Sequence, residues 1–301
     1  MSDHLIVVDW GTTNFRAFLV ERHGGQVIDE ITSAQGVSAL KSDEFAGYCD
    51  RMLAVWRQQD PHLPVYLAGM VGARRGWLES PQPPLPVTLQ SLAGQMVAAP
   101  GLANGWILPG ARLVEADGLC DVMRGEEVQV LGVQHLVHKQ NYACCLPGTH
   151  SKWARVRSGQ LTRFATAMTG ELYQTVLAHT LPGQPADGKA PFDEHAFALG
   201  LARAASEGGV LHALFEARSR YLYAGLAPQE IGSFISGVLI GEEVQRMVSS
   251  WKELSLLYVV GSNTLALPYR LALESHGISV EFITARDATL AGVIAMAESD
   301  R

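Results

Sequence analysis

The stretch Leu5–Val20, LIVVDWGTTNFRAFLV, decides the fold. Four apolar residues, three of them β-branched, lead into Asp9, and an apolar-rich run resumes at Phe15. The polar Gly-Thr-Thr-Asn segment between them is rich in turn formers, so the pattern predicts two antiparallel strands joined by a tight loop. Backbone N–H groups and two threonine hydroxyls in such a loop form a donor surface that suits phosphate. Asp9 is a hard oxygen ligand for Mg²⁺, although a plain hairpin with a capping aspartate fits the same residues.

A second copy of this pattern occurs at Tyr142–Val156, YACCLPGTHSKWARV. Each copy is followed by a glycine turn and a third β-like run. Two such three-stranded units predict two similar domains, each offering a phosphate loop to a cleft between them. The alignment of the two loops pairs Gly11 with Gly148, Thr12 with Thr149 and Asn14 with Ser151.

The composition is that of a globular protein with ample core. The chain has 301 residues, of which 48% are hydrophobic and 18% charged. A net charge of −7 argues against a general nucleic-acid binder, whose footprint would be a basic face. No apolar run approaches the roughly 20 residues of a membrane span, and residues 1–10 lack the features of a signal peptide. The four cysteines form no CxxC or zinc spacing, which predicts reduced thiols in the cytoplasm.

A proline-rich loop dominates the middle of the first half. It follows a predicted helix over Asp43–Gln59 and a short strand that begins after Pro64. Four prolines in residues 73–88, ARRGWLESPQPPLPVT, exclude a helix or a central strand. The loop is either a connector or a substrate loop whose arginines bind a carboxylate and whose indole covers a sugar face. The side chains concerned are Arg74, Arg75 and Trp77.

An acidic segment precedes the second phosphate unit. A strand pair is expected within Trp106–Glu115, and a helix is expected to start within Asp121–Gly132, DVMRGEEVQVLG. Glu126 and Glu127 in its first turns either complement the helix dipole or supply a general base. The position directly before the second phosphate unit favours the base.

The second half alternates strands and helices. Residues 164–177 predict a strand and then a helix with Thr169 as its N-cap, and residues 181–195 predict a loop before two further helical segments. The helix predicted over Glu230–Val248 carries small residues near one stripe, which indicate close approach of another backbone or of a flat ligand. These small residues are Gly232, Ser236, Gly237 and Gly241.

The chain ends with a strand–turn–helix segment, a strand and a last helix. The small-residue turn enters the helix N-terminus directly, which suits a nucleotide. This alternation predicts a mixed α/β protein. The turn consists of Gly261, Ser262 and Asn263.

Missing motifs narrow the chemistry. The sequence contains no GxxxxGK[ST] P-loop, no GxGxxG, no GxSxG and no HExxH. P-loop kinases, Rossmann dehydrogenases, serine hydrolases of that type and zincins are therefore poorly supported. A phosphate-handling protein without a P-loop remains.

These blocks together resemble a known family. DWGTTNFR at 9–16, LPGTHSKW at 146–153 and VVGSN at 259–263 resemble the two phosphate motifs and the adenosine motif of the actin/hexokinase/Hsp70 superfamily. With GMVGARRGW, MRGEEVQVLG, AMTGELY and SGVLIGEE, they look like the 2-dehydro-3-deoxygalactonokinase family along essentially the whole chain. The resemblance implies two ribonuclease-H-like α/β domains with mixed sheets flanked by helices. It also implies ATP-dependent phosphorylation of 2-keto-3-deoxygalactonate at the C6 hydroxyl, with ATP and Mg²⁺ as cofactors.

The resemblance gives each block a role. Asp9 would lie near Mg²⁺, and Glu126 is the preferred general base, with Asp121 and Asp9 left open. Phosphate contacts would come from Gly11, Thr12, Thr13, Asn14, Gly148, Thr149 and Ser151, and adenosine contacts from Gly261, Ser262 and Asn263. The candidates for binding the sugar acid are Arg16, Arg74, Arg75, Trp77 and Arg124.

The domains are expected at 1–139 and 140–301, with the last helix free to pack back on the first. The expected partners are a sugar acid and ATP, without nucleic acid or membrane, and a homodimer is compatible with the sequence. Three alternatives stay open. They are a related sugar, polyol or pantothenate-type kinase, a nucleotide-switched ATPase, and a phosphatase acting on phosphate polymers.

Overall fold

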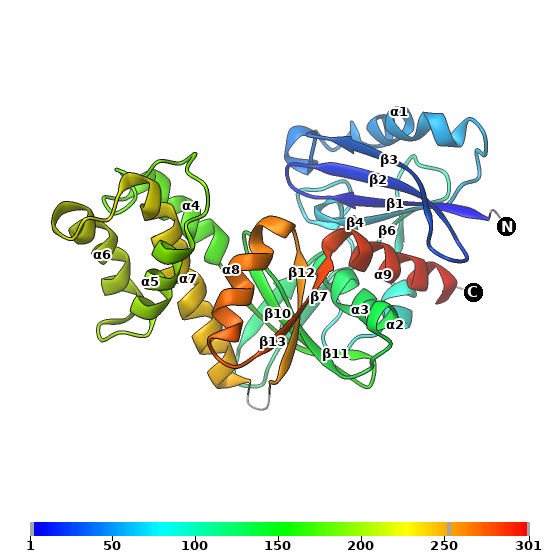
Figure 1. The fold of residues 1–301 in the computed structure, drawn as a ribbon. Coiled ribbons are helices and arrows are strands. Elements are labelled where there is room, and N and C mark those ends of the chain that lie inside the picture. The colour runs from blue at the N-terminus through cyan, green and yellow to red at the C-terminus, as the bar shows by residue number, and fades with distance from the viewer. Residues whose placement is uncertain (1–2, 252–253, 300–301) are drawn as a thin grey trace. The chain divides into compact units, whose positions relative to one another are not determined.

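The chain forms two compact units, which Figure 1 colours along the sequence in a computed structural model that describes residues 3–251 and 254–299. The N-terminal unit comprises Met1–Tyr142, Ala154–Phe164 and Ala285–Arg301, and the C-terminal unit comprises Ala143–Trp153 and Ala165–Thr284. The last helix thus belongs to the same unit as the first strands. Within the described ranges, no helix has the length and apolar character needed to cross a membrane.

A six-stranded sheet forms the centre of the N-terminal unit, in the order β3-β2-β1-β4-β6-β5. The predicted hairpin and its third strand are confirmed, because β1, β2 and β3 pair antiparallel in sequence order. β1 then pairs parallel with β4, and β4 pairs parallel with β6. The strands are β1 (His4–Trp10), β2 (Phe15–Glu21), β3 (Val27–Ser33), β4 (Val65–Gly69), β5 (Val97–Ala98) and β6 (Gly105–Ile107).

An aromatic cluster fills one face of this sheet. Trp10 from β1 meets Phe15 from β2 edge-on, with ring centroids 4.9 Å apart. Phe45 and Tyr48, from helix α1 (Phe45–Arg57), lie 5.2 and 5.5 Å from the same indole. α1 is the helix predicted over residues 43–59. The helical spacing of its apolar residues places them on the face that packs against this sheet.

The remaining elements of this unit correct two expectations. The two strands expected within Trp106–Glu115 are present, but they do not pair with each other: β6 joins the large sheet, while β7 (Ala111–Val114) pairs with β8 (Cys120–Met123). β8 also occupies the start of the segment expected to be helical, so Asp121 lies in a strand. The helices are α2 (Leu89–Ala93), α3 (Glu126–Val137) and α9 (Ala285–Ser299), with 3-10 turns η1 (Val37–Ala39) and η2 (Met70–Gly72).

A second sheet of five strands has the order β11-β10-β9-β12-β13. Its first three strands are the second three-stranded unit predicted from the sequence. β12 pairs parallel with β9 and with β13. Parallel strands connected through helices are the arrangement expected of an α/β protein. The strands are β9 (Tyr142–Leu146), β10 (Ser151–Arg157), β11 (Gln160–Ala167), β12 (Leu256–Gly261) and β13 (Ser279–Thr284).

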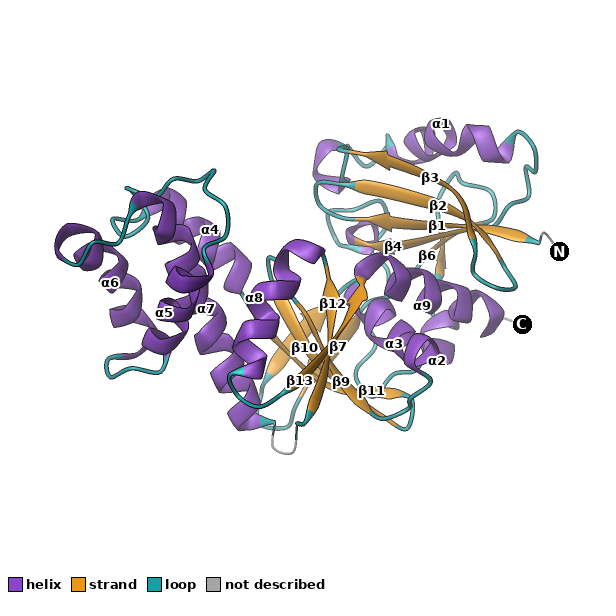
Figure 2. Cartoon of the chain, in the orientation of Figure 1, coloured by secondary structure: helices purple, strands orange, loops and turns teal. Residues whose placement is uncertain are grey.

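Helices dominate the rest of the C-terminal unit, where Figure 2 shows α4 to α7 gathered as a bundle. The glycine stripe of α7 is explained in part by helix packing. A Cβ atom on Gly237 would lie 2.2 Å from the carbonyl oxygen of Phe197, so α5 and α7 cross at backbone contact. The helices are α4 (Thr169–His179), α5 (Glu194–Ala204), α6 (Gly209–Tyr223), α7 (Pro228–Ser250) and α8 (Asn263–Glu274).

Candidate active site

The first phosphate loop, Gly11–Asn14, is hydrogen-bonded to the 3-10 turn η1 and the residues next to it. The carbonyl oxygen of Gly11 accepts a hydrogen bond from the Val37 N–H at 3.0 Å, and that of Thr12 accepts from the Ser38 N–H at 3.0 Å. The Ser38 hydroxyl also donates to the Thr12 carbonyl at 2.7 Å. The carbonyls therefore face the fold, while the side chains of residues 12–14 are exposed. The exposed hydroxyls of Thr12 and Thr13 are compatible with the predicted phosphate contact, which stays a prediction.

Asp9 lies at the end of β1, opposite Arg16 on β2 and beside Ala68 on β4. Burial raises the pKa of Asp9, and the nearby Arg16 guanidinium partly offsets this. A divalent cation would stabilise the charged carboxylate in the same way, so this donor fits Mg²⁺. Mg²⁺ commonly takes one or two carboxylates together with phosphate oxygens and water. Among the described residues there is no cluster of three or more acidic, histidine or cysteine side chains that could hold a metal.

The start of α3 approaches the ends of β1 and β4. Trp10 pairs with Gly69, and a Cβ atom on Gly125 would lie 2.9 Å from the Gly69 Cα. Gly125 also has φ of 99°, a left-handed conformation that favours glycine. The Glu126 carboxylate that follows is partly exposed and accepts a hydrogen bond from the Arg124 backbone N–H at 3.0 Å. The candidate base therefore belongs to the same end of the sheet as Asp9.

Glu127 is the fully buried acid of this segment, with 0% of its surface exposed. Both of its carboxylate oxygens accept from the Gly125 N–H at 2.9 Å. Burial and the neighbouring Glu126 raise the pKa of Glu127 to about 8, although backbone hydrogen bonds and Arg124 work against the shift. The sequence left Glu126 and Glu127 open as partners of the helix dipole or as a general base, and the family resemblance favoured Glu126. The burial of Glu127 was not visible in the pattern, because two adjacent acids look equivalent before the helix is oriented.

Arg124 is tied to the proline-rich loop. Its guanidinium donates to the Ser80 hydroxyl and, at 3.0 Å, to the Ser80 carbonyl oxygen. Burial lowers the pKa of Arg124, while Glu127 and Glu79 raise it. Arg74 and Arg75 lie exposed on the same loop after η2. The loop therefore carries two exposed guanidinium groups, and the Arg124 guanidinium is hydrogen-bonded to it at Ser80.

Two other candidates for the sugar acid have different surroundings. Trp77 is buried in the aromatic cluster, with its ring stacked on Phe45 at 5.9 Å and 12°. Its position indicates a packing role, in contrast to the sugar face expected from the sequence. Arg16 is exposed on β2 and lines a shallow surface depression with Asn14 and Thr32. Asp121 lies on β8, where its carboxylate accepts from the Val122 N–H at 2.7 Å.

The second phosphate loop connects β9 and β10 and lies against the start of α4. The Glu171 N–H donates to the Thr149 carbonyl at 3.0 Å, and His150 contacts the Glu171 carboxylate at 2.7 Å. Thr149 is exposed, as expected of a phosphate ligand. Ser151 differs, because it is fully buried and its hydroxyl lies 2.9 Å from the Tyr269 hydroxyl. Its alignment with Asn14 predicts a phosphate contact, but the side chain points into the protein.

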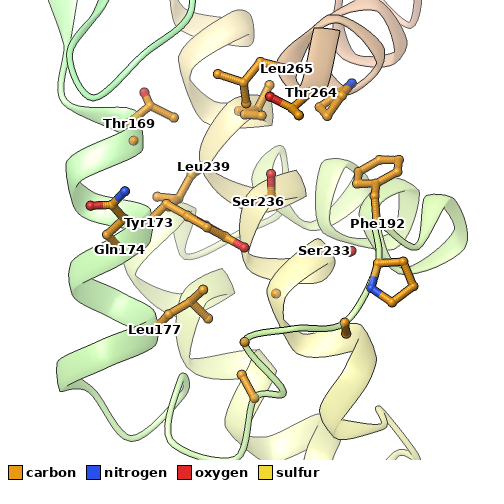
Figure 3. A pocket seen from close by; sticks show the side chains of 18 of the residues that line it. Thr169, Tyr173, Gln174, Leu177, Phe192, Ser233, Ser236, Leu239, Thr264 and Leu265 are labelled. Carbon is orange, nitrogen blue, oxygen red and sulfur yellow. The ribbon is translucent and has the colours of Figure 1, made fainter. Parts of the chain in front are cut away.

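A cavity of about 530 Å³ opens beside this loop, within the size range of small-molecule sites. Gly148 and Thr149 border it, together with residues of α4, α7, α8 and the loop 186–192. Figure 3 shows Tyr173 reaching into the cavity from α4, with Phe192 on the other side and Ser236 of α7 between them. The cavity thus offers aromatic surface and hydroxyl groups next to a loop suited to phosphate.

The predicted adenosine turn leads into α8 at the same cavity. A Cβ atom on Gly261 would lie 3.7 Å from Pro147 of the phosphate loop. The Ser262 hydroxyl is 2.8 Å from that of Thr264, and Thr264 and Leu265 line the cavity in the first turn of α8. Gly232 and Ser236 line it from α7, so this part of the glycine stripe faces the cavity. Close packing is confirmed at Gly237, while a ligand against Gly232 and Ser236 stays a prediction.

Three residues of this region were missed by sequence reasoning. Tyr173 and Phe192 lie in segments interpreted as a plain helix and loop, and no local signal marks them. Glu243 on α7 is buried, with 5% of its surface exposed. It follows Leu239 and Ile240 by four and three residues, so an acid on the apolar face of a helix was the available signal.

Known proteins match the chain over nearly its whole length. A family model described as DGOK, 2-keto-3-deoxy-galactonokinase, matches residues 9–296. The 2-dehydro-3-deoxygalactonokinase of Escherichia coli (strain K12) is 33% identical over 301 residues, covering 99% of each chain. The crystal structure of a Sinorhizobium meliloti protein assigned the same activity is 34% identical, covers 98% of each chain and has a TM-score of 0.91.

A more distant solved structure shares the fold alone. The activator of 2-hydroxyisocaproyl-CoA dehydratase from Clostridium difficile, solved with bound ADPNP, has a TM-score of 0.52 at 12% identity. The alignment covers 98% of this chain and 95% of that one. The predicted fold class, with mixed sheets flanked by helices, is confirmed. The family match extends over both units, and this chain belongs to the 2-keto-3-deoxy-galactonokinase family.

Proposed function

We propose that this protein transfers the γ-phosphoryl group of ATP to the C6 hydroxyl of 2-dehydro-3-deoxy-D-galactonate, giving the 6-phosphate in galactonate catabolism. The observation that carries the proposal is the match to the kinase family over residues 9–296, which contains every predicted motif. The cavity beside the second phosphate loop supports it, because a nucleotide needs an apolar pocket next to phosphate donors.

In this proposal the cavity of the C-terminal unit holds the nucleoside. Tyr173 and Phe192 provide apolar faces for the base. The turn at Gly261–Asn263 is assigned to the ribose, because it leads into α8, whose Thr264 and Leu265 line the cavity. Gly148 and Thr149 offer backbone and hydroxyl donors to the phosphates, and the loop Gly11–Asn14 offers a second set. Mg²⁺, held through Asp9, would neutralise charge on the transferring phosphoryl group.

Acceptor binding is assigned to the proline-rich loop. Arg74 and Arg75 are exposed and can form charge-assisted hydrogen bonds with the sugar-acid carboxylate. Arg124 keeps N–H groups beyond the two bonds to Ser80 and holds the loop in place. A neutral sugar lacks the carboxylate and should bind poorly.

Glu126 is the proposed general base. Its carboxylate accepts the C6 hydroxyl proton while the hydroxyl oxygen bonds to the γ-phosphorus. The bond from this phosphorus to the β–γ bridging oxygen breaks, and ADP leaves. Orientation of the hydroxyl supplies part of the rate enhancement.

We place this reaction in the cytoplasm and propose a homodimer as the assembly to test. The compartment is supported by the free cysteines, of which Cys49, Cys144 and Cys145 are buried. Burial raises the pKa of each of these thiols, which keeps them neutral. Mass measurement in solution tests the dimer.

The decisive experiment measures ADP release by the purified protein with MgATP and a panel of acceptors. The panel contains 2-keto-3-deoxygalactonate, its gluconate epimer, galactonate, glucose, glycerol and pantothenate. We expect strong activity with the first, weaker activity with its epimer and none with the neutral acceptors. Turnover without an acceptor, or activity only on a neutral sugar, would overturn the proposed reaction.

A further inference from the structure

A buried carboxylate lies beneath the second phosphate loop. Glu243 of α7 accepts a hydrogen bond from the Trp153 indole N–H at 2.7 Å and from the Tyr269 hydroxyl at 2.8 Å. The Thr169 hydroxyl donates to the same oxygen as Tyr269. Tyr269 in turn lies 2.9 Å from the Ser151 hydroxyl. One carboxylate thus joins β10, the start of α4, α7 and α8.

The chemistry of the donors fixes the direction of these bonds. An indole N–H can only donate, and the single proton of Tyr269 is directed to Glu243, so Ser151 donates to Tyr269. Burial raises the pKa of Glu243, while the hydrogen bonds from Thr169, Trp153 and Tyr269 lower it. A buried acid that accepts several hydrogen bonds is costly to disturb, because each partner would lose its acceptor.

The groups that Glu243 holds define the geometry of the loop. Ser151 is the first residue of β10, directly after the loop. Thr169 opens α4 and precedes Gly170, whose Cβ position would lie 2.4 Å from the Gly148 carbonyl oxygen. Thr169 and Tyr269 also line the cavity. A shift of either anchor would move the loop relative to the cavity.

We propose that Glu243 is the positioning residue of the second phosphate loop, setting the loop against the nucleotide cavity through Thr169, Tyr269 and Ser151. The inference rests on the proposed function for the identity of the nucleotide. Glu243 acts through its neighbours and is not itself a ligand of ATP. Its loss should therefore impair ATP binding and phosphoryl transfer more than it impairs acceptor binding.

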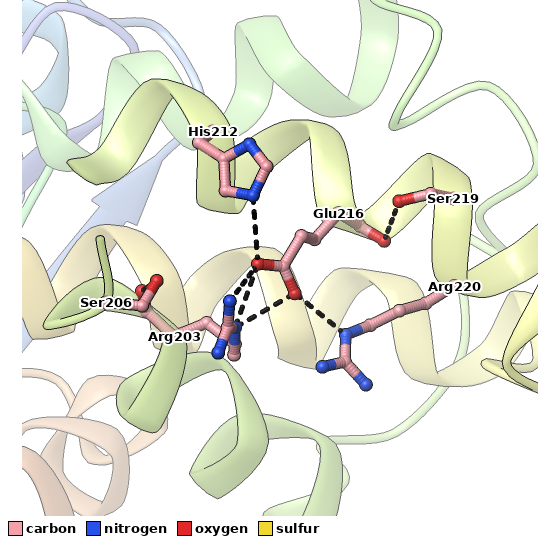
Figure 4. Close-up of polar contacts among 6 residues, drawn as sticks. All are labelled: Arg203, Ser206, His212, Glu216, Ser219 and Arg220. Carbon is pink, nitrogen blue, oxygen red and sulfur yellow. Dashed lines mark hydrogen bonds and ion pairs between the residues drawn. The ribbon is translucent and has the colours of Figure 1, made fainter. Parts of the chain in front are cut away.

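The competing explanation is that this cluster only stabilises the fold. The chain offers a matched control in Glu216 of α6, which Figure 4 shows in a second polar cluster. Glu216 accepts from the Arg203 Nε at 2.9 Å and from the Arg220 Nε at 3.1 Å, with His212 Nε2 at 3.6 Å. None of these four residues is among those that line the cavity. Glu216→Gln thus disturbs a carboxylate network of this unit away from the loop.

The experiment compares Glu243→Gln, Thr169→Val and Thr169→Ser with Glu216→Gln and the wild type. Glutamine keeps the shape of Glu243 but replaces one acceptor by a donor, which conflicts with the Tyr269 and Thr169 protons. Serine at 169 keeps the hydroxyl, whereas valine removes it. For each protein we would measure the Kd for MgATP by calorimetry, the KM for ATP and for the sugar acid, kcat and the thermal midpoint.

We expect Glu243→Gln and Thr169→Val to weaken MgATP binding by about tenfold or more and to lower kcat, because small misplacements of a binding group are costly. Thr169→Ser should keep most of the wild-type affinity for MgATP. In all of these variants the KM for the sugar acid should change by less than about threefold. Glu216→Gln should lower the thermal midpoint without changing the kinetic constants.

Two outcomes would overturn the inference. One is a Glu243→Gln protein that loses thermal stability but binds MgATP as the wild type does. The other is equal behaviour of Thr169→Ser and Thr169→Val. If the wild type binds MgATP but phosphorylates no sugar acid, the proposed function fails, while the comparison of Kd values still decides the role of Glu243.

Discussion

Gly170 lies against Gly148 so closely that a Cβ atom on Gly170 would be 2.4 Å from the Gly148 carbonyl oxygen. The first turn of α4 and the second phosphate loop are therefore in backbone contact. The same first turn carries Thr169, whose hydroxyl donates to Glu243 instead of capping the helix. The sequence predicts Thr169 as an N-cap, but the residue before α4 is Met168 and makes no side-chain cap. The second phosphate loop therefore packs against the first turn of α4, and the position of that turn is set by tertiary contacts such as the one between Thr169 and Glu243.

Gly170→Ala should displace the second phosphate loop. The contact atom belongs to the backbone, so the added methyl group cannot be accommodated by a side-chain rotation. We expect kcat/KM for ATP to fall by about 10²-fold, as for a misplaced binding group. Gly47→Ala is the control, because its methyl group would meet only the Arg51 side chain at 3.6 Å in α1. Equal kinetics of the two variants would contradict the prediction.

Glu126→Gln tests the general base. The amide cannot accept the C6 hydroxyl proton, so kcat should fall by about 10²–10⁴-fold while both KM values stay close to normal. Steady-state kinetics with saturating MgATP checks this. Near-normal turnover would remove Glu126 from the role and direct attention to Asp9 and Asp121.

Glu127 gives the protein a pH-dependent stability. Its pKa is raised from about 4.5 to about 8 by burial and by Glu126, so the folded state binds this proton more tightly than the unfolded chain. Its contribution is therefore fully present below pH 4.5 and is lost as the pH rises to about 8. Between about pH 5 and 8, the unfolding free energy of the wild type should fall more than that of Glu127→Gln, by on the order of a few kcal/mol. Parallel denaturant titrations of the two proteins measure the difference, and identical pH profiles would refute it.

Arg74→Ala should impair recognition of the sugar-acid carboxylate. Loss of a hydrogen bond to a charged group is worth roughly 1.5–3 kcal/mol, so the KM for the sugar acid should rise about tenfold or more. The KM for ATP should stay the same. Arg51→Ala is the matched control, because Arg51 is an exposed arginine of α1 that lies over the Tyr48 ring. A parallel rise of both KM values in Arg74→Ala would count against a carboxylate site.

Trp77 should behave as a core residue. Its ring packs on Phe45 and lies 6.5 Å from that of Trp10. Trp77→Ala should cost about 3–5 kcal/mol of unfolding free energy, as for other large-to-small core changes. Trp77→Phe should cost less and leave the KM for the sugar acid unchanged. A Trp77→Phe protein of normal stability with a raised KM for the sugar acid would restore the sugar-face interpretation.

Local patterns were sufficient wherever one period or one turn controls the backbone. The hairpin at Leu5–Val20, its second copy and the helix at residues 43–59 are all present, because alternating and helical burial is written directly in the sequence. The helix prediction failed around Asp121 because strand β8 is only four residues long and is stabilised by pairing with β7. Such pairing is not local, so short strands escape pattern analysis.

The candidate site divides in the same way. The loops at Gly11–Asn14 and Gly148–Thr149 were found because turn-forming residues between strands have a local signature. Trp77 was expected to contact the sugar acid and Ser151 a phosphate, but both side chains are buried. The direction of a side chain depends on what packs around it. The difference between the partly exposed Glu126 and the buried Glu127 is of the same kind.

The sequence by itself determined the two strand–loop–strand units, the mixed α/β class and the family, because these depend on local periodicity and on motif order. Tertiary structure alone decided that Glu243 collects the hydroxyls of Thr169 and Tyr269, residues 74 and 26 positions away. It also decided that Tyr173 and Phe192 face one cavity. Such groups meet only when the helices pack, and the burial that brings them together is a property of the whole unit.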